Sequence, residues 1–312
     1  MAPSVAERLR GPVVPLNVCF TAAGEVDLPA MGRYADWLCA QGVPVLLLTY
    51  GSSEYAWLSD DDVYRLTAVV AESVAGRACF VTSSAFWPAK VCAPFLRHAQ
   101  EVGADAVKVQ INPWGLSGPG ERKAELLRTY FDEAGEGSTI PLLLWLNSGG
   151  GPSLPVDLVA EMAARDRVVG LKNDDHPFYD YYDLCRATRD EEFAVLSGGQ
   201  MRNFVLGHQL GSTGYLCTAA PFRPDVALTF YDTLVRGDYD GAWRAVARWE
   251  DRWLAAAVEV GWLRAIKTAL FLHGLQPSDR LGGTWTEATP DEREAVGRVL
   301  TEVFGPIDRV EL

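Results

Sequence analysis

Eight short apolar segments, separated by segments with helical spacing, follow one another along the chain from Val13 to Thr218. Each apolar segment is too short for a helix and almost continuously apolar, as parallel strands are when both faces are buried. The predicted strands are residues 13–20, 44–50, 78–83, 106–112, 141–147, 168–172, 194–197 and 214–218, and the intervening predicted helices include 28–40, 61–75, 88–102, 121–134 and 156–164. This alternation predicts an α/β fold, a closed (β/α)8 or TIM barrel.

A doubly wound open sheet is the alternative architecture, but it usually has fewer strands. Moreover, no Gly-x-Gly-x-x-Gly motif follows any predicted strand, so the main nucleotide-binding signature of that fold is missing. Beyond Pro224 the pattern is helical throughout, over residues 226–236, 239–258, 262–273 and 290–304. We therefore predict a barrel over residues 1–223 and a C-terminal helical extension, residues 224–312, packed on it.

Composition limits the classes of partner. The net charge of −13 argues against nucleic acid and anionic membrane surfaces as partners, although a local pocket can still oppose that sign and bind an anion. The longest apolar stretches last only a few residues, and the N-terminus lacks the apolar core of a signal peptide, so a cytoplasmic protein is expected. The six cysteines form no Cys-x-x-Cys pair and are expected to be reduced and mostly buried.

Lys172 is the most informative residue for function. It ends the apolar run 168–171 and precedes a polar turn, so it lies where the barrel strands end and where barrel enzymes hold their catalytic groups. Burial disfavours the ammonium form, and the neutral amine is a nucleophile toward carbonyl carbon. The residues alone leave open a lysine that simply points to solvent. Among the five lysines the rival amine is Lys108, expected instead to reach solvent or pair with an acid.

The other predicted strand ends are rich in small hydroxyl residues, amides and glycines, a composition that suits a carboxylate and a polyhydroxylated chain. Gly51-Ser52-Ser53 follows the second predicted strand, where converging backbone amides and hydroxyls could hold an anion. Ordinary turn chemistry explains the same residues equally simply. Glu54 could orient those hydroxyls or cap the next turn. The tryptophans of the C-terminal helices, at helical spacing, are expected to pack in the core or an interface rather than stack on a sugar.

Several motifs, in order, resemble the dihydrodipicolinate synthase / N-acetylneuraminate lyase family of class I aldolases. They are Phe20-Thr21 with Gly24-Glu25-Val26-Asp27, Gly51-Ser52-Ser53-Glu54 with Leu58-Ser59, Gly103-Ala104-Asp105-Ala106, Val169-Gly170-Leu171-Lys172, Ser197-Gly198 with Gly211 and Gly214, and Ile266-Lys267-Thr268-Ala269-Leu270 with Gly274. The resemblance implies a barrel with C-terminal helices that assembles as a homotetramer or homodimer. It also implies that Lys172 forms a Schiff base with a 2-oxo acid. By the same resemblance, Ser52 and Ser53 would hold the carboxylate of that acid. The predicted substrate-binding residues are Ser52, Ser53, Glu54, Asn147 and Gly198, and no metal or cofactor is expected.

The chain departs from the family pattern at three places. Leu146 stands where the family has a catalytic tyrosine, Pro113-Trp114-Gly115 lacks the tyrosine expected from a neighbouring subunit, and Gly149-Gly150-Gly151 replaces an arginine that binds a second carboxylate. These differences argue against dihydrodipicolinate synthesis itself. Proton transfer then needs another group, and the candidates are Tyr50, Tyr55, Asp174, Asp175 and His176.

Two further candidate sites have simpler explanations. Arg202 could meet a distal carboxylate or phosphate, or lie on a helix surface. A metal at Asp174-Asp175-His176 is not expected, because adjacent residues rarely converge on one ion. The predicted function is a Schiff-base lyase, an aldolase or dehydratase, acting on a 2-oxo acid such as a deoxy sugar acid or a pyruvate-derived substrate. The alternative is a non-catalytic 2-oxo acid sensor of the same fold.

Overall fold

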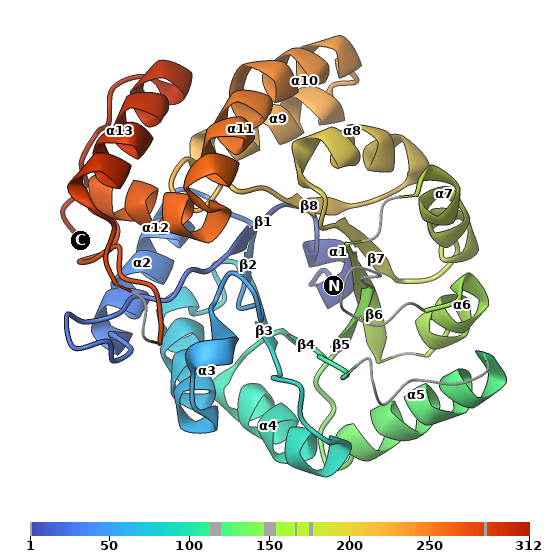
Figure 1. The fold of residues 1–312 in the computed structure, drawn as a ribbon. Coiled ribbons are helices and arrows are strands. Elements are labelled where there is room, and N and C mark those ends of the chain that lie inside the picture. Colours follow the sequence, from blue (N-terminus) through green and yellow to red (C-terminus); the bar gives the residue numbers. More distant parts are fainter. Residues whose placement is uncertain (1, 113–119, 147–153, 166, 175–176, 284–285) are drawn as a thin grey trace.

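The computed structural model describes residues 2–112, 120–146, 154–165, 167–174, 177–283 and 286–312, and it forms a closed barrel of eight parallel strands (Figure 1). The strands follow one another around the barrel in sequence order, and β8 pairs with β1. They are β1 (Gly11–Pro15), β2 (Val45–Leu47), β3 (Cys79–Ser83), β4 (Ala106–Lys108), β5 (Leu142–Leu146), β6 (Val168–Asn173), β7 (Ala194–Ser197) and β8 (Gly214–Leu216). The predicted (β/α)8 barrel is confirmed, with each strand overlapping a predicted apolar segment.

One helix follows each strand and packs on the outside of the barrel. These helices are α2 (Leu28–Ala40), α3 (Asp60–Val74), α4 (Ala89–Val102), α5 (Gly120–Ala134), α6 (Val156–Ala163), α7 (Phe178–Ala187), α8 (Gln200–Leu210) and α9 (Pro224–Val235), with a short 3-10 helix, η1 (Tyr55–Trp57), before α3. Their apolar faces and the outward side chains of the strands form a continuous buried core. A smaller apolar cluster fills the barrel interior.

The N-terminal helix α1 (Val5–Arg8) lies at one end of the barrel, at the centre of the ring in Figure 1. Leu9, which follows it, is fully buried and packs with Val13 and other residues of the interior cluster. Arg8 fixes this helix from outside by an ion pair to Asp105, 2.5 Å long. The interior is therefore apolar where the strands begin, so polar chemistry is left to the end where they finish.

The helical extension predicted after Pro224 is confirmed. Its first helix, α9, packs against β1 as the eighth outer helix of the barrel. The domain boundary between residues 223 and 224 stays a prediction, and it lies directly before this helix. The remaining elements are α10 (Tyr239–Ala245), the π-helical turn η3 (Val246–Glu250), α11 (Asp251–Val260), α12 (Trp262–Leu272) and α13 (Pro290–Phe304). The π turn interrupts what the sequence predicts as one helix. There the buried Glu250 carboxylate accepts the backbone N–H groups of Met201 and Arg202 at the start of α8.

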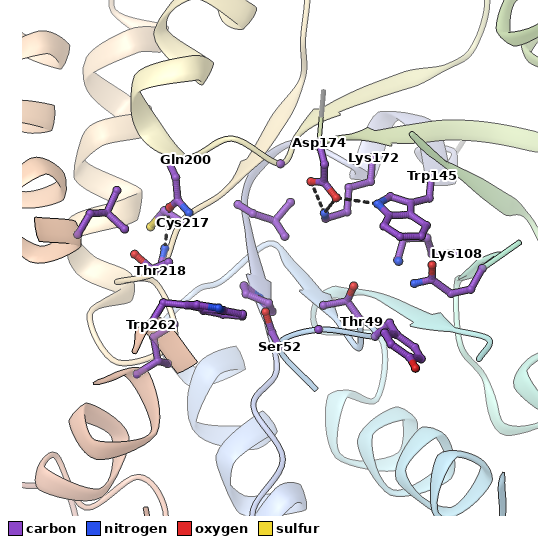
Figure 2. A pocket seen from close by; sticks show the side chains of 18 residues that line it. Thr49, Ser52, Lys108, Trp145, Lys172, Asp174, Gln200, Cys217, Thr218 and Trp262 are labelled. Atoms are coloured by element: carbon purple, nitrogen blue, oxygen red, sulfur yellow. Dashed lines mark hydrogen bonds and ion pairs between the residues drawn. The ribbon is translucent and has the colours of Figure 1, made fainter. Parts of the chain in front are cut away.

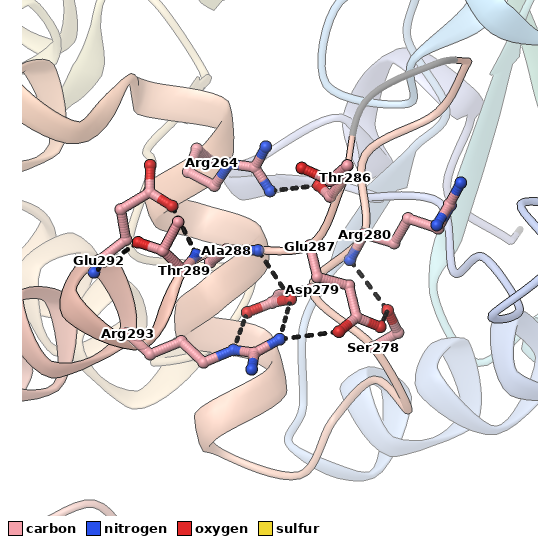
Figure 3. Close-up of polar contacts among 10 residues, drawn as sticks. All are labelled: Arg264, Ser278, Asp279, Arg280, Thr286, Glu287, Ala288, Thr289, Glu292 and Arg293. Atoms are coloured by element: carbon pink, nitrogen blue, oxygen red, sulfur yellow. Dashed lines mark hydrogen bonds and ion pairs between the residues drawn. The ribbon is translucent and has the colours of Figure 1, made fainter.

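The segment between α12 and α13 is held by a polar network (Figure 3). Arg293 donates to both oxygens of the fully buried Asp279, at 2.8 and 2.9 Å, and also reaches Glu287 at 3.0 Å. A capping box joins Thr289 and Glu292 at the start of α13. This network stabilises a segment that contacts the loop after β2, because the N–H of Gly282 in the segment donates to Glu54 in that loop.

Across the described residues, no helix combines the length and apolar character needed to cross a membrane. All six cysteines are free thiols, and five of them are buried.

Candidate active site

A cavity of about 390 Å3 lies at the C-terminal ends of the strands (Figure 2). Its volume falls in the range of about 300–1,000 Å3 that is typical of small-molecule sites. Side chains from most strand ends line it, joined by three from the C-terminal extension: Pro15, Thr49, Tyr50, Gly51, Ser52, Lys108, Gln110, Trp145, Lys172, Asp174, Gly198, Gln200, Leu216, Cys217, Thr218, Leu254, Trp262 and Ile266. The cavity therefore lies at the end of the barrel where the sequence predicts the site.

Lys172 and Asp174 form the charged centre of the cavity. Lys172, 8% exposed, lies near the end of β6, and its ammonium donates to both oxygens of the Asp174 carboxylate. Trp145 on β5 adds a hydrogen bond from Nε1 to Asp174 Oδ2, 2.6 Å long. Burial alone would raise the pKa of Asp174, but the Lys172 ammonium and the indole N–H hold that pKa below its ordinary value. Asp174 is therefore an ionised carboxylate.

Gly198 makes room for this carboxylate. A Cβ atom at Gly198 would lie only 1.6 Å from Asp174 Oδ1 and 2.7 Å from its Cγ. The backbone N–H of Gly198 donates to the carbonyl oxygen of Asn173 at 2.8 Å, so the two strand ends are fixed relative to each other. The glycine predicted as a substrate-binding residue does line the cavity, and its missing side chain also permits the Lys172–Asp174 pair.

Lys108 is a second amine in the cavity. It is only 1% exposed, and its Nζ lies 5.1 Å from the centre of the Trp145 ring. No carboxylate of the described residues comes within ion-pairing distance of it, so the expectation that it reaches solvent or pairs with an acid is wrong. Burial, and next the positive charge of Lys172, lower the pKa of Lys108 well below its usual value, with Asp174 opposing them.

The three residues predicted after β2 have different surroundings. Ser52 lines the cavity. Ser53 is fully buried, and its hydroxyl donates to the carbonyl oxygen of Leu16 at 2.5 Å and accepts the N–H of Thr49 at 2.9 Å, so it is occupied by backbone groups. Only Ser52 of the pair offers its hydroxyl to a ligand.

The Glu54 side chain does not line the cavity, forms no capping hydrogen bond with η1, and bonds to no serine hydroxyl of the described residues. Its backbone adopts a left-handed conformation, with φ of 56°, and its buried carboxylate joins two distant segments. Oε1 lies 3.2 Å from the fully buried Lys267 ammonium of α12, and Oε2 accepts the N–H of Gly282 at 2.7 Å. Glu54 thus ties the loop after β2 to the C-terminal extension.

The remaining candidates fall into three groups: residues that the structure does not describe, a residue that lines the cavity, and residues that do not line it. Asn147, Asp175 and His176 lie outside the described residues. Tyr50 lines the cavity, whereas Tyr55 is buried beside it without lining it. Arg202 is half exposed on α8 and pairs with Glu250 and Asp251, so it has the helix-surface role.

On β5, the side chain that faces the cavity belongs to Trp145, and Leu146 packs in the outer core. Leu146 therefore does not take the inward place that the motif alignment assigned to it, because successive strand residues point to opposite faces.

Two cavity residues could not be found from motifs. Trp262, which begins α12, lines the cavity and is 43% exposed, whereas Trp253 packs in the core as expected. Gln200 has a positive φ of 73°, an uncommon conformation for a residue with a side chain, and its Oε1 accepts the N–H of Thr218 at 3.1 Å. The hydrogen bond to Thr218 holds the Gln200 amide at the cavity wall.

The sequence model of the Dihydrodipicolinate synthetase family matches residues 8–303. The chain belongs to this family. Members are class I, aldolase-type lyases, and this chain is an enzyme of that class. The lysine of the sixth strand, Lys172, lies inside the cavity as the resemblance implied.

Relatives in the family include 4-hydroxy-tetrahydrodipicolinate synthase 1 of Streptomyces coelicolor, 26% identical over 70% of this chain and 69% of the relative. "Putative 2-dehydro-3-deoxy-D-gluconate aldolase YagE" of Escherichia coli is 25% identical over 73% of this chain and 75% of that protein. The crystal structure of YagE in complex with pyruvate superposes with a TM-score of 0.80 at 20% identity, covering 94% of this chain and 98% of YagE, and so supports the fold. The homotetramer or homodimer and the cytoplasmic location stay predictions.

Proposed function

We propose that this family member is a lyase in which Lys172 forms a Schiff base with a 2-oxo acid, and that its substrate is a deoxy sugar acid or another pyruvate-derived 2-oxo acid. One observation carries the proposal: the Lys172 amine lies inside the cavity at the strand ends, paired with the Asp174 carboxylate. YagE, whose name describes a 2-dehydro-3-deoxy-D-gluconate aldolase and whose structure holds pyruvate, supports the substrate class.

Asp174 is proposed to move the protons. It accepts a proton from the Lys172 ammonium, and the neutral amine then adds to the ketone carbon of the substrate. Once Lys172 has lost its charge, the interaction that holds the pKa of Asp174 down is weaker, so Asp174 keeps the proton until the carbinolamine has formed. That proton goes to the hydroxyl of the carbinolamine, which leaves as water, and the nitrogen becomes an iminium.

The iminium draws electrons from the neighbouring carbon. In one route Asp174, ionised again, takes the proton of the hydroxyl beyond the next carbon–carbon bond, that bond breaks, and an aldehyde departs. In the other route a proton and then a hydroxyl are lost as water, and both routes pass through an enamine. Protonation of the enamine carbon restores the iminium, and water hydrolyses it to free the 2-oxo acid and the amine. Trp145 cannot carry a proton as a tyrosine would, which is why the proton transfer is assigned to Asp174 and why dihydrodipicolinate synthesis is not proposed.

Borohydride trapping tests the proposal. Reduction in the presence of pyruvate should add to Lys172 the mass of pyruvate, less one water and plus two hydrogens, as located by peptide mass spectrometry. Lys172→Ala should abolish the adduct, while Lys90→Met, at an exposed lysine on α4, should leave it intact. An adduct on Lys108 instead of Lys172, or none, would contradict the proposal.

Turnover separates an enzyme from a sensor. The wild-type protein should cleave or dehydrate at least one member of a panel of 2-oxo-3-deoxy sugar acids, and Lys172→Ala should not. A protein that traps pyruvate on Lys172 but turns over no substrate of the panel would favour the non-catalytic alternative.

A further inference from the structure

The buried amine of Lys108 has no part in the chemistry assigned to Lys172 and Asp174. Lys108 is almost completely buried on β4, and the described residues bring no carboxylate within ion-pairing distance of it. Its ammonium lies over the face of the Trp145 ring, 5.1 Å from the ring centre. A buried, unpaired ammonium is unfavourable for folding. Because Lys108 faces the cavity, an anionic ligand bound there could act as its counter-ion.

Gln110 is a second buried polar residue that lines the cavity close to Lys108. The two residues are two positions apart, and the intervening Val109 packs in the outer core, so both side chains face the barrel interior and line the cavity. Gln110 is fully buried, yet within the described part of the chain neither its Nε2 nor its Oε1 has a hydrogen-bond partner. Buried amides normally have such partners. The β4 wall, formed by Lys108 and Gln110, therefore presents an ammonium and an amide donor that the described residues leave unsatisfied.

The charge of the cavity indicates what these donors bind. Lys108, Lys172 and Asp174 are the charged side chains among the described residues that line it, so the protonated site has one positive charge in excess. Ser53, which the family resemblance would assign to a carboxylate, has its hydroxyl occupied by backbone groups. A carboxylate needs donors and a positive charge, and the β4 wall supplies both.

We propose that Lys108, assisted by Gln110, binds a carboxylate of the substrate and so makes this enzyme selective for anionic 2-oxo acids. This inference rests on the proposed function. Lys108 acts as the counter-ion of the substrate and takes no part in bond formation. Trp145 keeps the two amines in separate roles, because its ring face lies against Lys108 while its Nε1 bonds to Asp174, the partner of Lys172 (Figure 2).

The bound carboxylate could be the one next to the ketone or a second one at the far end of the substrate, and three probes distinguish them. Pyruvate carries only the first carboxylate, methyl pyruvate carries none, and 2-oxoglutarate carries both. The concentration that gives half-maximal borohydride trapping is measured for each probe in the wild type, in Lys108→Met and Lys108→Gln, and in Lys90→Met as the matched control.

In both Lys108 variants the half-maximal concentration of pyruvate and of 2-oxoglutarate should rise about 10- to 100-fold, which corresponds to the loss of one hydrogen bond to a charged group. The half-maximal concentration of methyl pyruvate should not change. That result assigns the carboxylate next to the ketone. A loss confined to 2-oxoglutarate also supports the proposal and assigns the second carboxylate. If the variants affect all three probes equally, or none, Lys108 does not recognise a carboxylate and the proposal is overturned.

Failure of the proposed function gives a different result. If the wild type traps no probe, Schiff-base chemistry is refuted, and calorimetric titration with pyruvate and methyl pyruvate still tests Lys108. Preference for pyruvate that both variants lose supports the subsite, and no such preference overturns it. Far-UV circular dichroism of each variant confirms folding, which the neutral side chains of methionine and glutamine should not disturb.

Discussion

Replacement of Gly198 by alanine is the most direct test of how the cavity is built. The new methyl group would lie 1.6 Å from Asp174 Oδ1, whereas non-bonded atoms in favourable contact are about 3.5–4.0 Å apart. The carboxylate must therefore move by about 2 Å, by this comparison of distances. Such a movement breaks its bonds with Lys172 and Trp145.

The size of the effect follows from the bonds that are lost. A misplaced acid–base group typically costs about 10²- to 10⁴-fold in rate, so we expect the rate of pyruvate-dependent trapping to fall at least 100-fold. The stability cost should be about 1–3 kcal/mol, as for other insertions of a methyl group into a filled space. The backbone is a smaller obstacle, because the methyl group would lie 3.1 Å from the carbonyl oxygen of Asn173.

A double-mutant cycle with Asp174→Ala separates this mechanism from general damage. If the methyl group acts by displacing the carboxylate, Gly198→Ala should have little further effect in the Asp174→Ala protein. Gly297→Ala is the matched control, because its methyl group would meet only Leu272, at 3.6 Å, on the outer helix α13. The control should trap pyruvate normally. A Gly198→Ala protein that traps at the wild-type rate, or additive effects of the two substitutions, would refute the reasoning.

Three other substitutions give further expected outcomes. Trp145→Phe keeps an aromatic ring but removes the N–H bonded to Asp174, a hydrogen bond to a charged group worth about 1.5–3 kcal/mol, so kcat/KM should fall about 10- to 100-fold; an unchanged value would show that the indole only fills space. Glu54→Gln leaves the fully buried Lys267 ammonium without its counter-ion and should destabilise the protein by about 3–5 kcal/mol in urea unfolding; a loss below about 1 kcal/mol, as for an exposed pair, would contradict this. Lys108→Met should stabilise the protein. Burial puts the pKa of Lys108 below that of an unfolded lysine, so the unfolded chain binds more protons between the two values and wild-type stability rises with pH there. The advantage of the variant should therefore shrink as pH rises toward the pKa of an unfolded lysine, about 10.4; a constant difference would be inconsistent with this origin.

The amino-acid sequence by itself determined the architecture and the position of the reactive amine. Apolar runs too short for helices and separated by amphipathic segments can be buried on both faces only as strands of a parallel sheet, and eight of them close into a barrel. Lys172 could be placed at the mouth of that barrel because it ends one such run, and strand ends are local in sequence.

Which side chains face the cavity was decided by the tertiary structure. In a strand, a shift of one residue turns a side chain to the opposite face, so motif spacing could not distinguish Trp145 from Leu146. Likewise, Ser52 and Ser53 look equivalent in the sequence of the turn. In the structure, however, the Ser53 hydroxyl bonds to the backbone of Leu16, which is distant in sequence, and of Thr49, which is in the same loop. The sequence does not reveal these two contacts.

The charge arrangement of the site depends most on closure of the barrel. Lys108 and Lys172 are far apart in sequence, and only the pairing of β4, β5 and β6 brings both amines and the Trp145 ring to one cavity. Local sequence can show that a lysine follows apolar residues. Whether that lysine finds a counter-ion is a property of the residues around it in space, because electrostatic interactions act across distances between atoms and not along the chain.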